Sequence, residues 1–329
     1  MLARIANELY WIGRYVSRAE HNARMLDGVF RINLQARRGL GGDEMPWEAV
    51  MAVMGAPPPE GNGGVGATEA VHRLTLDPDT EASVTSCAEA AREGAKKVRD
   101  VVSREMWEAL NTLYLELDAS DLPSALRTGP YSIYAFVRER CALWWGLAEE
   151  TMLRDEAHAF LTAGRHVEGA SMMLRMLRVS LVPAAVKAGP DGLGGGGAPA
   201  IALLNAVGGL EAFRRSVAGT ATAEQVARFL IFEPGYPHSL TASMNLLFER
   251  LEEIDQRSAA PLLRLARLRA ELEFSGGARA GDDDDLHDDE PLPLAPLLEH
   301  IQAELELVDT EIHRRYFTGG AGVSQVVTG

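Results

Sequence analysis

Apolar residues recur at helical spacing along most of the chain, and this pattern predicts an all-α fold. In the first such stretch they follow one another at steps of three and four residues, which places them on one face of a helix. Runs of alternating Val, Ile and Thr that would indicate strands are nearly absent. The apolar stripe consists of Ile12, Val16, Ala19, Ala23, Leu26 and Phe30. A helix of this kind must bury its stripe against neighbouring helices.

Several further segments have the same periodicity and lengths that are typical of helical bundles. They cover residues 83–117, 132–153, 222–232, 239–258 and 293–317. We therefore expect a helical bundle.

The chain also repeats itself. The segment GRYVSRAEHNARML, which starts at Gly13, realigns on GRHVEGASMMLRML, which starts at Gly164. Further along, LTLDPDTEASVT, ending at Thr85, realigns on LIFEPGYPHSLT, ending at Thr241. In both copies an acidic residue and Pro precede a Ser that can cap a helix. The repeat predicts one domain over residues 1–318, built from pseudo-equivalent halves, 1–150 and 151–318, about an approximate twofold axis.

Three segments rich in Gly, Pro and like charges interrupt the helical pattern, at residues 56–66, 187–199 and 276–293. Such segments cannot bury enough apolar surface to order themselves, so we predict loops. The acidic run from Asp282 to Asp285, with His287, lacks the Gly and Glu spacing of a calcium-binding loop and is expected to be solvated. The tail, residues 319–329, is predicted to be disordered.

The net charge limits the partners. The 329 residues have a formal charge of -15, which argues against general affinity for nucleic acid or anionic membranes. No apolar run is long enough to span a bilayer, and the charged N-terminal stretch does not fit a signal peptide, so we expect a cytoplasmic protein. The two cysteines, Cys87 and Cys141, have no spacing typical of disulfides or metal sites and are expected to be buried thiols.

The segment LYWIGRYVSRAEHNARMLD resembles the N-terminal signature of the Alpha-E family, bacterial all-helical proteins named for a Glu-Arg motif. The resemblance continues through TMLRDEAHAFLTAGRHVEGA and YPHSLTASM and covers nearly the whole chain. The family signature has Glu-Arg in both copies, and this chain divides that pair. The first copy has Ser17 and keeps Arg18, whereas the second keeps Glu168 and has Gly169. His158 stands where the family usually has Trp.

The resemblance implies a role beside other proteins. Alpha-E proteins accompany circularly permuted ATP-grasp ligases and transglutaminase-like proteins, in systems predicted to make or modify peptides. It implies a helical accessory or substrate-presenting subunit of an amide or peptide ligase, and it establishes no catalytic activity for the family. Carried over by position, the candidate functional residues are Arg14, Arg18, Glu20, Arg165 and Glu168.

Arginine gives these positions a physical meaning, because several guanidinium groups that converge can bind carboxylate or phosphate. If the two signature helices face each other, Arg14, Arg18 and Arg165 could line a shared cleft for a small anionic or peptide ligand, with Glu20 or Glu168 fixing their orientation. Arg92 and Arg99, seven residues apart on the next predicted helix, could add to this cleft.

Two alternatives remain open at this stage. In the first, the charges only hold helices together: Glu20 and Arg24 form an ordinary i,i+4 pair, while Arg14 and Arg18, which helical spacing places away from the apolar stripe, bridge to acidic residues on other helices. In the second, Glu168 or Glu20 is a general acid or base of a hydrolase or transferase.

Cofactor and metal sites are not indicated by the sequence. His21 and His166 lack the helical ligand spacing of a metal site, and the glycine-rich segments lack the lysine of a phosphate-binding loop. We therefore expect neither a metal nor a cofactor.

Overall fold

The computed structural model describes residues 1–38, 45–56, 65–120, 124, 131–181, 197–217, 219, 221–255, 259–277 and 293–318. Within these residues the chain forms helices and no strand, so the all-α prediction is confirmed. In chain order the helices are α1 (Ala3–Arg37), α2 (Trp47–Met54), α3 (Ala67–Thr75), α4 (Val84–Lys97), α5 (Arg104–Asp118), α7 (Tyr131–Thr151), α8 (Glu156–Ser180), α10 (Gly197–Val207), α11 (Leu210–Ser216), α12 (Ala223–Phe232), α13 (Leu240–Ile254), α14 (Ala260–Gly277), α15 (Leu294–Ile312) and the short π-helix η1 (His313–Phe317).

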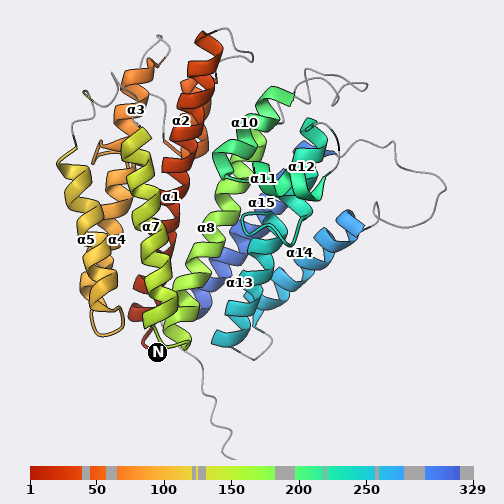
Figure 1. The fold of residues 1–329 in the computed structure, drawn as a ribbon. Coiled ribbons are helices and arrows are strands. Elements are labelled where there is room, and N and C mark those ends of the chain that lie inside the picture. Colours follow the sequence, from red (N-terminus) through yellow and green to blue (C-terminus); the bar gives the residue numbers. More distant parts are fainter. Residues whose placement is uncertain are drawn as a thin grey trace, which may run out of the picture.

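Two long helices, α1 and α8, form the centre of the bundle (Figure 1). Helix α1 packs against α4, α7, α10 and η1 as well as α8, and α8 also packs against α13, α15 and α2. Figure 1 shows α3, α4, α5 and α7 on one side of α1, and α8 with α10 to α15 on the other. Neither central helix is therefore left with a broad face toward solvent. None of the described helices is both long and apolar enough to cross a membrane.

The two central helices cross at a pair of glycines. A Cβ atom added at Gly13 would lie 2.0 Å from the carbonyl oxygen of Leu161, and one added at Gly164 would lie 2.0 Å from that of Tyr10. Only glycine allows backbones to approach so closely. The contact is reciprocal, since Tyr10 precedes Gly13 by the same number of residues as Leu161 precedes Gly164. This symmetry supports the division into two pseudo-equivalent halves, which stays a prediction.

A second pair of matching contacts lies where α4 and α13 begin. The hydroxyls of Ser83 and Ser239 cap these helices, each accepting from a backbone amide three residues ahead. Thr85 Oγ1 donates to the carbonyl of Thr75 at 3.0 Å, and Thr241 Oγ1 donates to that of Ile231 at 2.8 Å. The predicted helix starts after the two acidic-Pro turns are thus confirmed.

Other expectations need correction. The segment 83–117 is not one helix but two, because α4 ends at Lys97 and Ser103 caps α5 by accepting from the Met106 amide. Helix α10 begins at Gly197, inside the predicted loop 187–199, and α14 reaches Gly277, inside the predicted loop 276–293. Most of the three predicted loops, the acidic run and the tail lie outside the described residues. The helices α2, α3, α10, α11 and α14 were not anticipated from the sequence.

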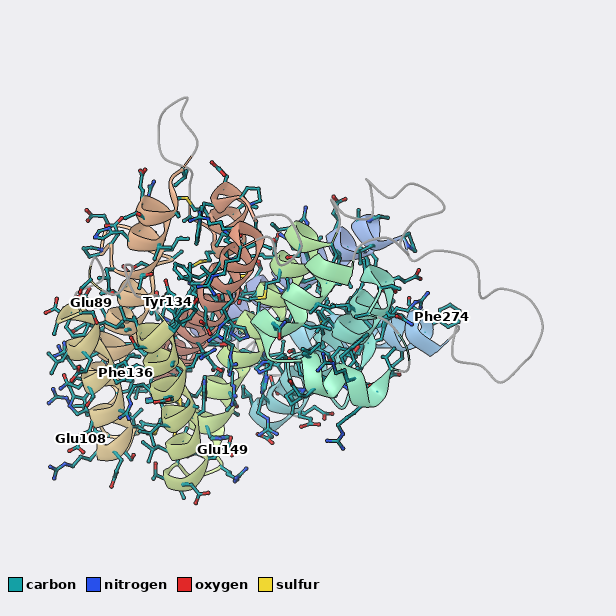
Figure 2. The ribbon with its side chains drawn as sticks, turned by 45° about the horizontal axis from the view of Figure 1, so that its top comes forward. Glu89, Glu108, Tyr134, Phe136, Glu149 and Phe274 are labelled. Carbon is teal, nitrogen blue, oxygen red and sulfur yellow. The ribbon has the colours of Figure 1, made fainter. Side chains whose placement is uncertain are left out.

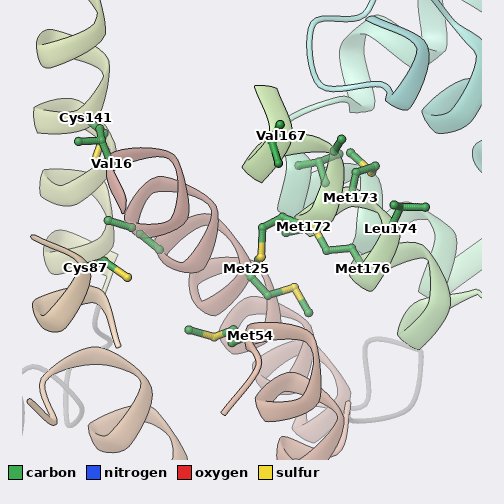
Figure 3. Close-up of a cluster of buried hydrophobic side chains, with 14 of the residues drawn as sticks. Val16, Met25, Met54, Cys87, Cys141, Val167, Met172, Met173, Leu174 and Met176 are labelled. Atoms are coloured by element: carbon green, nitrogen blue, oxygen red, sulfur yellow. The ribbon is translucent and has the colours of Figure 1, made fainter. Parts of the chain in front are cut away.

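The core between the central helices is rich in sulfur (Figure 3). Met25 of α1 lies near Met172 and Met176 of α8, and all three are buried. Methionine side chains are flexible and fill irregular space between helices. Cys87 and Cys141 lie on the other side of α1 and are fully buried, which confirms the expectation of core thiols.

Candidate functional site

The divided Glu-Arg motif is reassembled in space, between α1 and α8. Glu168 of α8 has no exposed surface. It accepts two hydrogen bonds from Arg18, from Nε to Oε1 at 2.6 Å and from Nη2 to Oε2 at 2.8 Å. Arg14 Nε donates to Oε2 at 2.9 Å. The glutamate of one signature copy thus binds the arginine that the other copy retains, and we call these three residues the signature cluster.

The signature cluster continues to the last helices of the domain. Arg14 Nη1 donates to Asp309 Oδ2 of α15 at 2.8 Å, and the Tyr10 hydroxyl donates to Asp309 Oδ1. The Arg14 guanidinium also lies 4.8 Å from the ring centroid of Trp11, within the range of a cation–π contact. Sequence reasoning missed Asp309, because no periodicity or spacing relates it to residues some 300 positions earlier. Arg14 is therefore held by two carboxylates and an aromatic ring.

Burial and the two arginines act in opposite directions on Glu168. Burial raises the pKa of this carboxyl group, but the charges and hydrogen bonds of Arg18 and then Arg14 outweigh it and lower the pKa to about 2. Asp309 behaves in the same way: burial raises its pKa, whereas hydrogen bonds from His313 and Tyr10 and the charge of Arg14 bring it to about 2. Both carboxylates are ionised at neutral pH.

This geometry limits what the signature cluster can do. A general acid or base must reach a substrate and exchange a proton near the working pH. Glu168 is enclosed, both its oxygens are occupied, and its pKa lies far below neutrality. Arg14 and Arg18, which helical spacing places away from the apolar stripe, are largely buried because other helices surround α1, and both bridge to acidic residues on those helices. The signature cluster is an internal brace between helices.

Arg165 belongs to a different group, so the three arginines that the sequence placed in one cleft do not converge. Its guanidinium lies 4.3 Å from the ring centroid of Trp145 on α7. Within the described part of the chain it has no hydrogen bond or ion pair; the acidic groups whose charge acts on it are Glu20 and Glu149. Glu149 is near the end of α7 (Figure 2). Burial is the largest influence on the pKa of Arg165 and lowers it; the charges of Glu20 and Glu149 raise it, but by less, so the pKa stays below its ordinary value.

Three histidines lie in the same region as Arg165, because its charge acts on His166 and His238 and the ring of His238 contacts that of His21. The rings of His21 and His238 meet edge to face with centroids 5.6 Å apart, and His21 Nδ1 lies 2.7 Å from the Ser17 carbonyl oxygen. The pKa of His166 falls to about 3, first through burial and then through the charges of Arg165, Arg250 and His238. The pKa of His238 falls to about 3 through burial and the charge of His21, with a smaller contribution from Arg165. His166 and His238 are therefore neutral imidazoles at pH 7.

The remaining candidates are arranged as follows. Glu20 accepts from Arg24 at 2.8 Å, which is the i,i+4 pair that the sequence suggested. Arg92 donates to Asn111 on α5 and lies 4.9 Å from the centroid of Tyr114, and Arg99 lies 5.7 Å from that of Trp107. Arg92 and Arg99 thus belong to the α4–α5 surface rather than to the signature cluster.

The possible metal ligands and His158 complete the list of residues that the sequence singled out. Among the described residues no group of three or more His, Cys, Asp or Glu is placed to hold a metal ion. The run from Asp282 to His287 lies outside those residues. His158 is buried, and its Nε2 lies 3.3 Å from Glu149 Oε1.

Comparison with known proteins gives a family and distant relatives. The profile of the Alpha-E family, described as a predicted alpha-helical domain with a conserved ER motif, matches residues 1–317. Uncharacterized proteins of Mycobacterium bovis and of two strains of Mycobacterium tuberculosis are 24% identical to the chain over 278 residues. The match covers 78% of this chain and 30% of each relative, so the chain spans less than a third of their length. No solved structure matches it.

Proposed function

The chain belongs to the Alpha-E family, and we propose that it is a helical accessory subunit, which presents substrate to, or regulates, a circularly permuted ATP-grasp ligase that forms amide or peptide bonds. In this proposal the ligase supplies nucleotide binding and catalysis. The chain supplies a rigid helical surface, and a transglutaminase-like protein is a further partner of the same system. The expected location is the cytoplasm.

The observation that carries the proposal is the state of Glu168. The motif that gives the family its description contains one carboxylate and one guanidinium, and here they neutralise each other inside the domain. A brace of this kind stabilises a scaffold and leaves no group in the signature cluster free for chemistry. This supports an accessory role over a hydrolase or transferase that would use Glu168 as acid or base.

The length of the relatives agrees with this role. In the mycobacterial proteins the matched region is 30% of a longer chain, so the domain there is joined to other sequence. A domain that accompanies a catalytic partner is expected to occur joined to other sequence in this way.

Reconstitution tests the proposal. The purified chain is mixed with a circularly permuted ATP-grasp ligase from the same organism, and association is measured by size-exclusion chromatography while ATP consumption and amide product are followed together. We expect co-elution and a change in product yield or identity, compared with the ligase plus an unrelated helical bundle. Absence of both association and any change in product would overturn the proposal.

A second candidate is a purely structural interaction protein, and the saturation of Arg14 and Arg18 favours it. This alternative predicts that the affinity for a protein partner does not change when small anions are added. The enzyme alternative predicts instead a turnover that is abolished by Glu168→Gln in a variant that keeps its helical content.

A further inference from the structure

Two equivalent arginines of the repeat have opposite surroundings. Arg14 and Arg165 each follow the glycine at which α1 and α8 cross. Arg14 is held by the carboxylates of Glu168 and Asp309 at 2.9 and 2.8 Å. Arg165, within the described residues, is held by no carboxylate. In place of the glutamate, the first signature copy has Ser17, whose hydroxyl donates to the Arg165 carbonyl oxygen rather than receiving its guanidinium.

The ring of Trp145 makes Arg165 a fixed donor. A guanidinium in cation–π contact with an indole loses freedom of rotation, and the contact uses none of its N–H groups as hydrogen-bond donors to an acceptor atom. Trp145 itself is 4% exposed, while Arg165 is only partly buried. None of the nitrogen atoms of Arg165, His166 or His238 is among the buried polar atoms without a partner. These donors therefore reach solvent at the edge of the group.

The charged side chains near Arg165 have ion-pair partners of their own. Arg24 pairs with Glu20 at 2.8 Å, and Arg250 pairs with Glu249 at 3.4 Å and with Glu253 at 3.0 Å. Glu149, which also acts on Arg165, has its own partner in Arg154 at 3.0 Å. His166 and His238 are neutral and supply ring N–H groups without charge. Among these described residues, Arg165 is the cation that has no ion-pair partner.

We propose that Arg165, with the imidazoles of His166 and His238 beside it, binds the carboxylate of a small acid or of a peptide C-terminus. The ligand takes the place that Glu168 and Asp309 have beside Arg14. A singly charged carboxylate matches one unpaired guanidinium, whereas a phosphate dianion would bring a second charge with no cation to meet it. The site lies outside the signature cluster and uses a side chain that the cluster leaves unpaired.

This inference extends the proposed function, since a substrate-presenting subunit needs a place to hold the group that a ligase joins. Its test uses this chain alone, so failure of ligase association and failure of carboxylate binding are separate results. The probes are acetyl-dialanine with a free C-terminal carboxylate, the same peptide as its C-terminal amide, acetate, and inorganic phosphate.

Binding is followed at pH 7 through the histidine Cε1–H signals in NMR titrations of the full chain. We expect the peptide acid to shift the signals of His166 and His238 in a saturable way, and the amide to leave them unchanged. Acetate binding as tightly as the peptide acid indicates a small free acid as the natural ligand, and tighter peptide binding indicates a peptide terminus. Equal shifts with acid and amide, no shift with either, or saturation by phosphate alone would overturn the assignment.

Variants test the role of the guanidinium. Arg165→Met keeps the length and apolar stem, and should weaken peptide-acid binding by about tenfold or more, as expected for loss of a charge-assisted hydrogen bond. Arg99→Met is the matched control, since Arg99 also lies over a tryptophan, at 5.7 Å, and should leave binding unchanged. Arg165→Lys keeps the charge without the fork and should bind with intermediate affinity. Unchanged binding in a folded Arg165→Met variant would refute the proposal; if that variant does not fold, the comparison of acid and amide on the parent chain decides.

Discussion

Replacing Glu168 by Gln tests whether the signature cluster braces the fold. The substitution keeps the size of the side chain and removes its charge, leaving Arg14 and Arg18 with side-chain exposures of only 10% and 17%. Lowering the carboxyl pKa from 4.5 to about 2 corresponds to about 3 kcal/mol of stability at neutral pH, at 1.36 kcal/mol per pKa unit. Removing one partner of a buried ion pair typically costs about 3–5 kcal/mol. Because Asp309 still holds Arg14, we expect the lower end, a loss of about 3 kcal/mol.

The loss should depend on pH in a defined direction. The pKa of Glu168 is lower in the folded protein than in the unfolded chain, so its contribution is fully present above the unfolded value of about 4.5. It declines as the pH falls from there toward 2, where the folded protein takes up the proton as well. The free-energy difference between parent and Glu168→Gln should therefore be constant from pH 7 to about 5 and shrink below that.

Urea denaturation followed by far-ultraviolet circular dichroism measures this difference at each pH. Glu89→Gln is the matched control, because Glu89 lies exposed on α4, and it should change stability by less than about 0.5 kcal/mol. If Glu168→Gln unfolds at the same urea concentration as the parent at pH 7, or if its deficit persists unchanged at pH 3, the buried charge does not stabilise the fold and the reasoning fails.

Three further predictions concern packing and capping. Gly164→Ala should lower the free energy of unfolding in urea by about 3 kcal/mol or more, because the added Cβ would collide with the Tyr10 carbonyl oxygen. Gly146→Ala is the control: this glycine lies on α7 with open space around it, so the change should be neutral or stabilising. Equal effects of the two substitutions would contradict the close crossing. Burial raises the pKa of the Cys87 thiol to about 12, so this thiol should react with iodoacetamide only on unfolding, and rapid labelling of the native chain, read by mass spectrometry, would refute its burial. Ser103→Ala should lower the thermal unfolding midpoint through loss of the α5 cap, worth about 1 kcal/mol, and an unchanged midpoint would show that the cap is dispensable.

The extent to which the sequence predicted this fold depends on how local each feature is. Amphipathic periodicity and Ser caps act within one or two helical turns, so the starts after Ser83 and Ser239 could be read directly. The break between α4 and α5 was missed because apolar spacing continues across it and hides the cap at Ser103. Short helices such as α2 and α11 depend on tertiary packing more than on their own pattern.

In the candidate site, too, contacts within one helix could be predicted from the sequence, and contacts between distant helices could not. The pair of Arg24 with Glu20 is a relation of i,i+4 on one helix and was foreseen. The repeat raised the question of whether Arg18 and Glu168 meet, but it could not show that the pair is buried. Burial depends on the helices packed around α1, which is a property of the assembled bundle. Asp309 could not be found from the sequence, since only the fold brings α15 to Arg14.

The divided motif explains why the two sides of the helix crossing differ. Adjacent residues on a helix point about 100° apart, so a Glu-Arg pair in one signature copy cannot close on itself and must reach the other helix. Two intact copies would give two such pairs across the crossing, and this chain retains one, between Arg18 and Glu168. On the other side, Gly169 lacks the arginine, and His21 Cε1 lies 3.9 Å from where its Cβ would be. Arg165, on the side of the crossing where Ser17 and Gly169 form no such pair, is the unmatched cation of the proposed carboxylate site.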